Sequence, residues 1–415
     1  SRKTERPTMA MAKQLVLWLA LCLQGDAAVL RAHKKLQVHQ GHRQALDNFN
    51  NMQYHGHFQV GPTSVKGIFD TGSFDLLVMS TRCTSCSNQA YDHASSSTYR
   101  EEGTMVRHVF GSGSIVSMRG YEKVSVGELS TSNQTIWEIM EHHIPALDVA
   151  GVDAIVGMGP GYGPGEMRDA TLVMSLNVDH FSFCVQRGAA NLPGYLYWQD
   201  PRGGADNSDF VSLPVVGRNH WAVRLGSVSF KRSGTSAPAE SSGLCESGCG
   251  AIVDSGTSLI LVPSAQIKVL AKYIQIQRDC SNFHSLPTIH LSMGDHMFAL
   301  PPRAYVIKTQ TDGQDTCQSG ISNLDKTSRV GPVWVLGLPF LREYYTVFDR
   351  SAMQLRVATA GSGCNPTPYV NPSTSAGKYN MTLADPRGLT VNTTHTVDGP
   401  LSVDMRFATI PIWAQ

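Results

Sequence analysis

The chain has 415 residues with 34 Lys and Arg against 33 Asp and Glu, so its formal net charge is only +1. This balance supplies no net field for gripping nucleic acid or an anionic membrane surface, and we expect neither as a partner. Hydrophobic residues make up 41% and charged residues 16%, with 38 glycines, which excludes wholesale disorder and favours turn-rich β-structure over a helical bundle.

The first segment has the layout of a secretory signal peptide. Basic residues precede an apolar run from Leu15 to Leu23, and small residues follow around Ala27. The run is far shorter than the roughly 20 residues that cross a bilayer. We therefore expect residues 1–27 to be a signal peptide, residues 28–45 to be a short basic prosegment-like stretch, and the protein to enter the secretory pathway without a membrane span.

The next informative element is the segment GIFDTGSFDLLV at residues 67–78. Its apolar approach predicts a buried strand that ends at Asp70 in a turn. Further along, RHVFGSGSIVSMRGYEKVSVG at residues 107–127 is typical of a β-hairpin with glycines at its tip. Helices are expected near residues 141–148 and 264–276.

The Asp70 motif recurs in the second half of the chain. Residues 251–262 read AIVDSGTSLILV, with Asp254 in the place of Asp70. At nearly the same interval, each aspartate is followed by an apolar run that ends in glycine, at Gly157 and Gly337. One such tetrapeptide is ordinary turn chemistry, but two copies followed by the same second element indicate two similar halves.

Two halves packed about a pseudo-twofold axis would bring Asp70 and Asp254 together. Two carboxyl groups a few ångströms apart cannot both ionise cheaply, so they share one proton and their apparent pKa values separate. Such a pair can deprotonate a bound water while it protonates a carbonyl oxygen. We predict Asp70 and Asp254 as the catalytic residues of a hydrolase that needs no metal and no other cofactor.

With these motifs the chain resembles the pepsin-like aspartic endopeptidases, from about Leu46 to Ala360. The segments similar to this family include FDTGS at 69–73, IVDSGTS at 252–258 and WVLGLPFLREYYTVFDR at 334–350. The resemblance implies a mostly β, bilobal fold with a cleft between two pseudo-twofold-related lobes. The expected lobes are residues 46–210, with the first aspartate and a flap, and residues 211–360, with the second aspartate.

The same resemblance implies roles for the residues around the two aspartates. Asp70 and Asp254 would hold the lytic water, supported by the hydroxyls of Ser73 and Thr257 on their outer oxygens. The other expected supports are the backbone of Gly72 and Gly256 on the inner oxygens, and the hydroxyls of Thr71 and Ser255 as cross-links between the loops.

The hairpin at 107–127 is similar to the substrate-covering flap of the family, with Phe110, Gly111, Ser112 and Gly113 at its tip. The family usually has Tyr in place of Phe110 and Trp in place of Leu77, and those two side chains share a hydrogen bond. Because both the Tyr hydroxyl and the Trp indole are replaced here, no polar group is left without its hydrogen-bond partner. We therefore expect an apolar flap contact in an active enzyme, with altered substrate preference.

Eight cysteines lie beyond the signal segment, and the secretory route favours disulfides among them. Cys83 with Cys86 and Cys245 with Cys249 also have the spacing of a four-thiolate zinc site, which is the weaker interpretation because neighbouring ligands are missing. The resemblance implies disulfides Cys245–Cys249 and Cys280–Cys317. The expected pairs are completed by Cys83–Cys86 and by the two remaining cysteines, Cys184 and Cys364.

The last segment, residues 361–415, is rich in Ser, Thr, Asn and Pro and is expected to be a flexible extension. Sequons at Asn133, Asn380 and Asn392 are candidate glycosylation sites. The resemblance implies a monomer that is secreted or lies in an acidic, lysosome-like compartment, and an extended peptide substrate with apolar residues at the scissile bond.

Three other classes of protein fit the sequence less well. A pepsin-fold protein that has lost catalysis and only binds peptides would not need both aspartates with their hydroxyl partners. A zinc peptidase would need a His-Glu-x-x-His helix, which the sequence lacks. An intramembrane aspartyl protease would need membrane spans.

Overall fold

The computed structural model describes residues 41–88, 91–110, 112–161, 169–186, 192–204, 207–217, 219–232, 234, 238–311, 313–372 and 390–392. The predicted signal peptide, most of the basic stretch, Gly111, Asn380 and most of the C-terminal extension lie outside the described residues.

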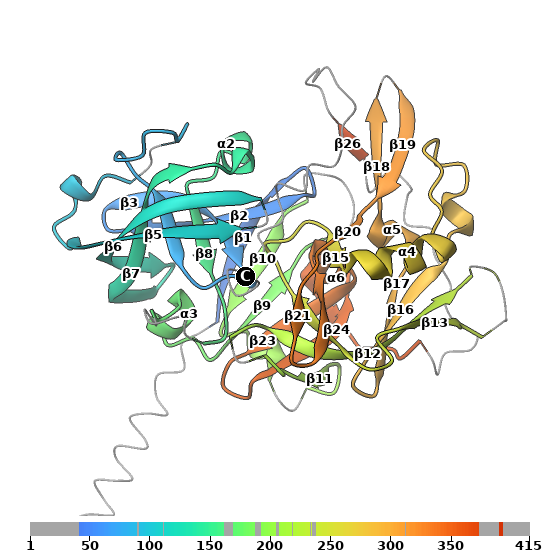
Figure 1. The fold of residues 1–415 in the computed structure, drawn as a ribbon. Coiled ribbons are helices and arrows are strands. Elements are labelled where there is room, and N and C mark those ends of the chain that lie inside the picture. The colour runs from blue at the N-terminus through green and yellow to red at the C-terminus, as the bar shows by residue number, and fades with distance from the viewer. Residues whose placement is uncertain are drawn as a thin grey trace, which may run out of the picture. The chain divides into compact units, whose positions relative to one another are not determined.

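The described residues form three β-sheets linked by short helices (Figure 1). The strands of the first sheet are, in spatial order, β11 (Val211–Pro214), β24 (Gln354–Ala360), β23 (Tyr344–Asp349), β9 (His180–Cys184), β10 (Gly194–Trp198), β1 (His42–Phe49), β2 (Gln53–Val60), β3 (Thr63–Asp70), β8 (Ala154–Gly157), β4 (Leu76–Met79), β7 (Leu129–His142), β6 (Gly113–Val126) and β5 (Arg100–Phe110), with β25 (Pro366–Thr367) beside β24. Those of the second are β17 (His296–Leu300), β16 (Thr288–Met293), β12 (Ala222–Lys231), β14 (Cys249–Val253), β22 (Gly331–Leu336), β15 (Ile260–Val262) and β20 (Ile321–Asn323), with β13 (Glu240–Leu244) beside β12 and β21 (Thr327–Ser328) beside β22. The third contains β19 (Gln314–Ser319), β18 (Val306–Thr311) and β26 (Thr390–Asn392).

The helices are short. The α-helices are α2 (Pro145–Ala150), α3 (Leu172–Ser175), α4 (Ser264–Tyr273), α5 (Pro302–Tyr305) and α6 (Leu338–Glu343), and the 3-10 turns are η1 (His93–Ser95), η2 (Pro201–Gly203), η3 (Phe283–Ser285) and η4 (Ser362–Cys364). Helix α4 begins after Pro263 as expected. The helix predicted at 141–148 is wrong at its start, because residues 141–142 finish β7 and the helix begins only at Pro145.

The two halves of the chain repeat one arrangement of strands. In the first half, β3 pairs in parallel with β8, and β4 runs antiparallel to β8 and parallel to β7. In the second half, β14 pairs in parallel with β22, and β15 runs antiparallel to β22 and parallel to β20. Strands β8 and β14 are buried along their whole length, as expected of apolar strands that are covered on both faces.

Gly157 and Gly337 occupy the same place in this repeat. The N–H of Gly157 donates to the carbonyl of Asp75 at 2.9 Å, and that of Gly337 to the carbonyl of Leu259 at 3.2 Å. A Cβ at either position would collide with the backbone of the loop that follows the aspartate. Only glycine permits this approach, which explains why the apolar run of each half ends in that residue.

The first sheet also joins the two halves. Strand β23 of the second half pairs with β9 of the first. Phe181 on β9 stacks on Phe348 on β23 with ring centroids 4.9 Å apart, and Trp221 packs edge-on against both rings. One apolar core therefore continues from one half into the other.

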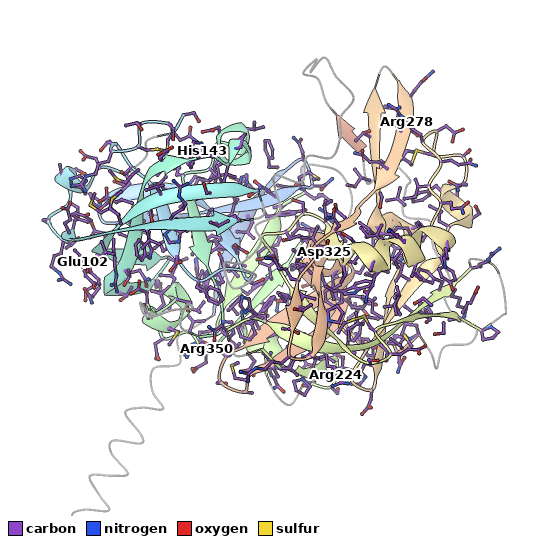
Figure 2. The ribbon with its side chains drawn as sticks, viewed as in Figure 1. Glu102, His143, Arg224, Arg278, Asp325 and Arg350 are labelled. Atoms are coloured by element: carbon purple, nitrogen blue, oxygen red, sulfur yellow. A yellow bond between two sulfur atoms is a disulfide. The ribbon has the colours of Figure 1, made fainter. Side chains whose placement is uncertain are left out.

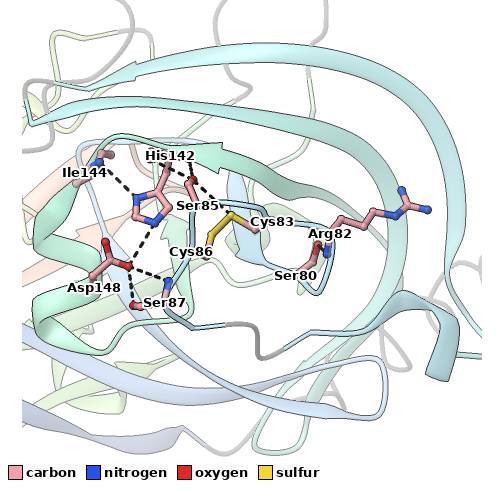
Figure 3. The surroundings of a disulfide bond; sticks show 9 residues. All are labelled: Ser80, Arg82, Cys83, Ser85, Cys86, Ser87, His142, Ile144 and Asp148. Atoms are coloured by element: carbon pink, nitrogen blue, oxygen red, sulfur yellow. Dashed lines mark hydrogen bonds and ion pairs between the residues drawn. A yellow bond between two sulfur atoms is a disulfide. The ribbon is translucent and has the colours of Figure 1, made fainter.

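Four disulfides join the cysteines that the sequence analysis pairs, namely Cys83–Cys86, Cys184–Cys364, Cys245–Cys249 and Cys280–Cys317. The thiols of the alternative zinc site are thus all oxidised to disulfides. Figure 3 shows the Cys83–Cys86 loop against the end of β7, where Ser85 Oγ accepts a hydrogen bond from His142 N at 3.0 Å.

A buried carboxylate, Asp200, lies close to the Cys184–Cys364 bridge. It accepts hydrogen bonds from Ser182 Oγ and the Tyr345 hydroxyl, both at 2.5 Å, and from Arg202 Nε at 3.1 Å. Arg202 also donates to the carbonyl of Cys364 at 3.2 Å. Burial acts to raise the pKa of Asp200, but these hydrogen bonds and the Arg202 charge outweigh it, so the pKa lies below the ordinary value.

We predict that Asp200→Asn destabilises the protein by about 1–3 kcal/mol near neutral pH, because it places an amide donor against donors. A carboxyl whose pKa is depressed by folding contributes stability above its unfolded pKa and loses it as pH falls through the folded pKa. The difference in unfolding free energy between the two proteins should therefore shrink in strong acid. Denaturant titrations across pH measure it.

The matched control is Asp179→Asn, because Asp179 is 58% exposed and its carboxylate lies as far as 3.6 Å from the guanidinium of Arg350. Arg350 is labelled in Figure 2. Such surface pairs contribute little. A loss at Asp200 that stayed constant down to strong acid would contradict the assigned charge state.

Candidate active site

Both repeated aspartates stand at the end of a buried central strand. Strand β3 ends at Asp70, and β14 ends one residue before Asp254. Both side chains are 0% exposed. A Cβ on Gly72 would lie 2.6 Å from Asp254 Cγ, so the two loops pack directly on each other and bring the carboxyl groups together.

Four hydrogen bonds cross-link the two loops. Thr71 Oγ1 donates to the carbonyl of Val253 at 2.9 Å and accepts from Ser255 N at 2.9 Å. Ser255 Oγ donates to the carbonyl of Phe69 at 2.6 Å and accepts from Thr71 N at 3.1 Å. Each hydroxyl is both donor and acceptor, so Ser255 plays the same part as Thr71 without the extra methyl group.

Each aspartate is also held within its own loop. Asp70 Oδ1 accepts from Gly72 N at 2.9 Å, and Asp254 Oδ1 accepts from Gly256 N at 2.8 Å. Thr257 Oγ1 donates to Asp254 Oδ2 at 2.7 Å. These donors orient the carboxyl groups and favour their charged forms.

Ser73 departs from the expected arrangement. Its Oγ and Asp70 Oδ2 are both buried without a hydrogen bond to each other, so the bond predicted between them is not formed. Serine lacks the β-branch that restricts Thr257 to few χ1 rotamers, so its hydroxyl turns more freely. The two aspartates therefore differ at this contact.

The pair of carboxyl groups retains a proton. Burial raises the pKa of Asp254 well above its usual range, and the neighbouring Asp70 carboxyl raises it further through its charge and a hydrogen bond. The bonds from Thr257 and Gly256 offset this only in part. The coupling between the two carboxyl groups therefore favours one proton on the pair.

Strands β5 and β6 form the hairpin predicted at 107–127, with Phe110 paired to Gly113 across its tip. Phe110 is buried in an apolar cluster that also contains Leu77 and Ile115. Gly113 has a φ of 147°, and a Cβ there would collide with the carbonyl of His143. The hairpin tip is thus anchored by apolar packing, in the manner expected from Phe110 and Leu77.

Trp137 is a further member of this cluster that the sequence motifs did not indicate. It lies opposite Leu77, on the adjacent strand β7, and packs edge-on against His108 with ring centroids 5.1 Å apart. The apolar pattern of its strand predicts burial, but only the strand pairing shows which residues it contacts.

Within the described ranges, no group of three or more His, Cys, Asp or Glu side chains is arranged to hold a metal ion. None of the helices in those ranges is long and apolar enough to cross a bilayer. Asn133 is exposed on β7, where its side chain bonds Arg100. Asn392 lies in β26, where only the backbone is described.

Comparison with known proteins agrees with this geometry. The family model for eukaryotic aspartyl proteases matches residues 53–360. The chain belongs to this family. It is 31% identical to a cathepsin D of Chionodraco hamatus over 76% of this chain and 83% of that protein. It is 32% identical to the renin of Canis lupus familiaris over 76% and 81%, and 33% identical to a cathepsin D of Gallus gallus over 74% and 80%. As a member of the aspartyl protease family, the protein is an aspartic endopeptidase with the mostly β, bilobal pepsin-like fold.

We predict that Thr71→Ala lowers the unfolding free energy by about 1–3 kcal/mol, because the change leaves the buried Ser255 N without its acceptor. Thr71→Ser is the matched control, since Ser255 already makes the equivalent bonds with the same side chain. Thermal and denaturant unfolding compare the two variants with wild type. Equal stability of Thr71→Ala and wild type would show that the cross-link contributes nothing.

Proposed function

We propose that Asp70 and Asp254 hydrolyse peptide bonds by activating a water molecule between their carboxyl groups. The observation that carries this proposal is the cross-link that holds two fully buried carboxyl groups together, with the pKa of Asp254 raised by burial and by Asp70. Aspartic proteases use such a pair of neighbouring carboxyl groups, which share one proton so that one acts as the acid and the other as the base.

In the proposed reaction, the ionised carboxylate takes a proton from water while the protonated carboxyl donates its own to the carbonyl oxygen of the substrate. The carboxyl that took the proton from water then donates it to the amine nitrogen, the C–N bond breaks, and a hydroxyl of the tetrahedral species gives its proton to the other carboxylate. The pair then holds one proton again. Each proton transfer is coupled to a second one, so the substrate carries no uncompensated charge. The N–H donors of Gly72 and Gly256 keep both carboxyl groups oriented throughout.

The proposed substrate is an extended peptide with apolar side chains on both sides of the scissile bond. The apolar cluster around Phe110 and Leu77 supports this preference, because the hairpin presents no tyrosine hydroxyl there. Phe110, Ser112 and Gly113 are the described residues of the proposed flap tip, and all three come from the β5–β6 hairpin.

We also propose the organisation expected from the sequence: a signal peptide at 1–27, a basic stretch at 28–45, lobes at 46–210 and 211–360, and an extension at 361–415. Four disulfides support passage through an oxidising secretory compartment. The protein would act as a monomer, secreted or in an acidic compartment, with Asn133, Asn380 and Asn392 as glycosylation sites.

The test compares the wild type with Asp70→Asn and Asp254→Asn on a peptide library in acid. Each variant should lose roughly a thousandfold or more in kcat/KM, because neither can share a proton with its partner. Asp325→Asn is the control, since Asp325 caps α4 at the surface by accepting from Ser264 N at 2.8 Å. Activity of Asp70→Asn equal to that of wild type would remove the mechanism, and a wild type that binds but never cleaves would indicate a peptide-binding protein.

A second prediction follows from the unequal hydroxyl contacts. Thr257→Val removes a donor that lowers the pKa of Asp254, so the pair should keep its proton to higher pH. The alkaline limb of the pH–rate profile should move up by about one pH unit. Ser73→Ala should leave this limb in place, because the serine hydroxyl does not bond either carboxylate. A shift of equal size in both variants would contradict the asymmetry.

A further inference from the structure

A buried histidine on the hairpin faces the loop that carries Asp70. His108 lies on β5, two residues before Phe110, and is 1% exposed. Its Nε2 lies 2.7 Å from Ser117 Oγ on β6. Its Nδ1 lies 3.4 Å from Asp75 Oδ2, within ion-pair reach but without hydrogen-bond alignment. The imidazole therefore stands between the two strands of the hairpin and the catalytic loop.

Asp75 is a rigid partner for this histidine. It follows Asp70 by five residues in the same loop, and its carbonyl accepts from Gly157 N at 2.9 Å. The tight backbone contact at Gly157 fixes that loop segment against β8. Because Asp75 and Asp70 lie in the same loop, a contact between His108 and the Asp75 carboxylate also restrains the loop that positions Asp70.

The other charged side chains near the His108 imidazole already have partners of their own. Arg119 on β6 forms an ion pair with Asp169 and lies 5.9 Å from the Trp137 ring centroid. Burial and the nearby charge of Asp75 raise the pKa of Asp169, but Asp169 already pairs with Arg119. Glu138 on β7 is engaged by Arg82 and His93. On its own strand, the neighbouring Arg107 bonds Ser114 at the surface.

We infer that His108 is a positioning residue that ties the flap to the catalytic loop through Asp75 when its imidazole is protonated. The inference rests on the proposed function, in which the hairpin covers the substrate. When both ring nitrogens carry a hydrogen, one N–H faces Ser117 and the other faces the Asp75 carboxylate. A neutral imidazole keeps the Ser117 contact but forms no ion pair with Asp75. The flap is thus held most firmly in acid.

This tie takes the place of the polar contact that Phe110 and Leu77 lack. Apolar packing of Phe110 resists pulling the hairpin away from the core, but it is not directional. An ion pair to a fixed carboxylate also defines the position of the hairpin relative to the catalytic loop. It also makes the position of the hairpin depend on pH, which apolar packing does not.

The kinetic test uses His108→Gln, which keeps a donor for Ser117 without the charge, together with Asp75→Asn. A looser flap must be ordered by the substrate itself, so KM should rise while kcat changes less than about twofold. The rise should be on the order of tenfold at about pH 5 and should vanish at about pH 7.5. The double variant should be no worse than either single variant.

A second measurement does not depend on catalysis. Hydrogen–deuterium exchange of peptides covering β5 and β6 should be faster in His108→Gln than in wild type at about pH 5, and equal at about pH 7.5. The matched control is His143→Gln, since His143 is 62% exposed beside the same hairpin and pairs with Glu141 at 2.7 Å (Figure 2). Its exchange and KM should match those of wild type.

The two measurements separate the two proposals. A wild type without peptidase activity would overturn the proposed function, while the exchange data would still test the tie. A pH-independent effect of His108→Gln, or an Asp75→Asn variant with unchanged KM and exchange, would overturn the tie even in a fully active enzyme. A loss of thermal stability that is the same at both pH values would show a purely structural histidine.

Discussion

Two buried carboxyl groups can share a proton only if the fold holds them together against their mutual repulsion and their lost hydration. In this protein the hydroxyls of Thr71 and Ser255 supply that constraint, since each bonds the backbone of the opposite loop in both directions. The parallel pairs β3–β8 and β14–β22 place these loops at the ends of buried strands, where the backbone has little freedom to relax. The glycines at 157 and 337 are required by the same arrangement, because they let the returning strand close against each loop.

Buried aspartates in this molecule have pKa values that are shifted in opposite directions, because their neighbours differ. Asp254 faces another carboxyl group, so burial and like charge act together to raise its pKa. Asp200 and Asp349 are buried too, but hydroxyl or backbone donors and an arginine reverse the effect of burial and lower the pKa. The first arrangement favours a protonated carboxyl group, and the second favours a charged one.

The two halves repeat the strand pairing but not every contact. Thr257 donates a hydrogen bond to Asp254, whereas Ser73 donates none to Asp70. The β5–β6 hairpin packs with the first half, where His108 and Trp137 contact each other beside Leu77. A duplicated backbone therefore carries two carboxyl groups that have different surroundings.

The sequence by itself determined the duplication, the two aspartates and the hairpin, because these depend on local patterns and on residues that recur at a nearly constant interval. Local patterns do not pair Cys184 with Cys364, which lie 180 residues apart. Periodicity also indicated the buried strands, although it set the helix near 141–148 too early, since the pairing of β7 with β6 extends that strand to His142. Only the tertiary structure decided that Ser73 does not bond Asp70, that Trp137 lies against Leu77, and that His108 faces Asp75. These contacts join side chains on different strands or depend on a single rotamer, and neither strand register nor rotamer choice is encoded in a local run of residues.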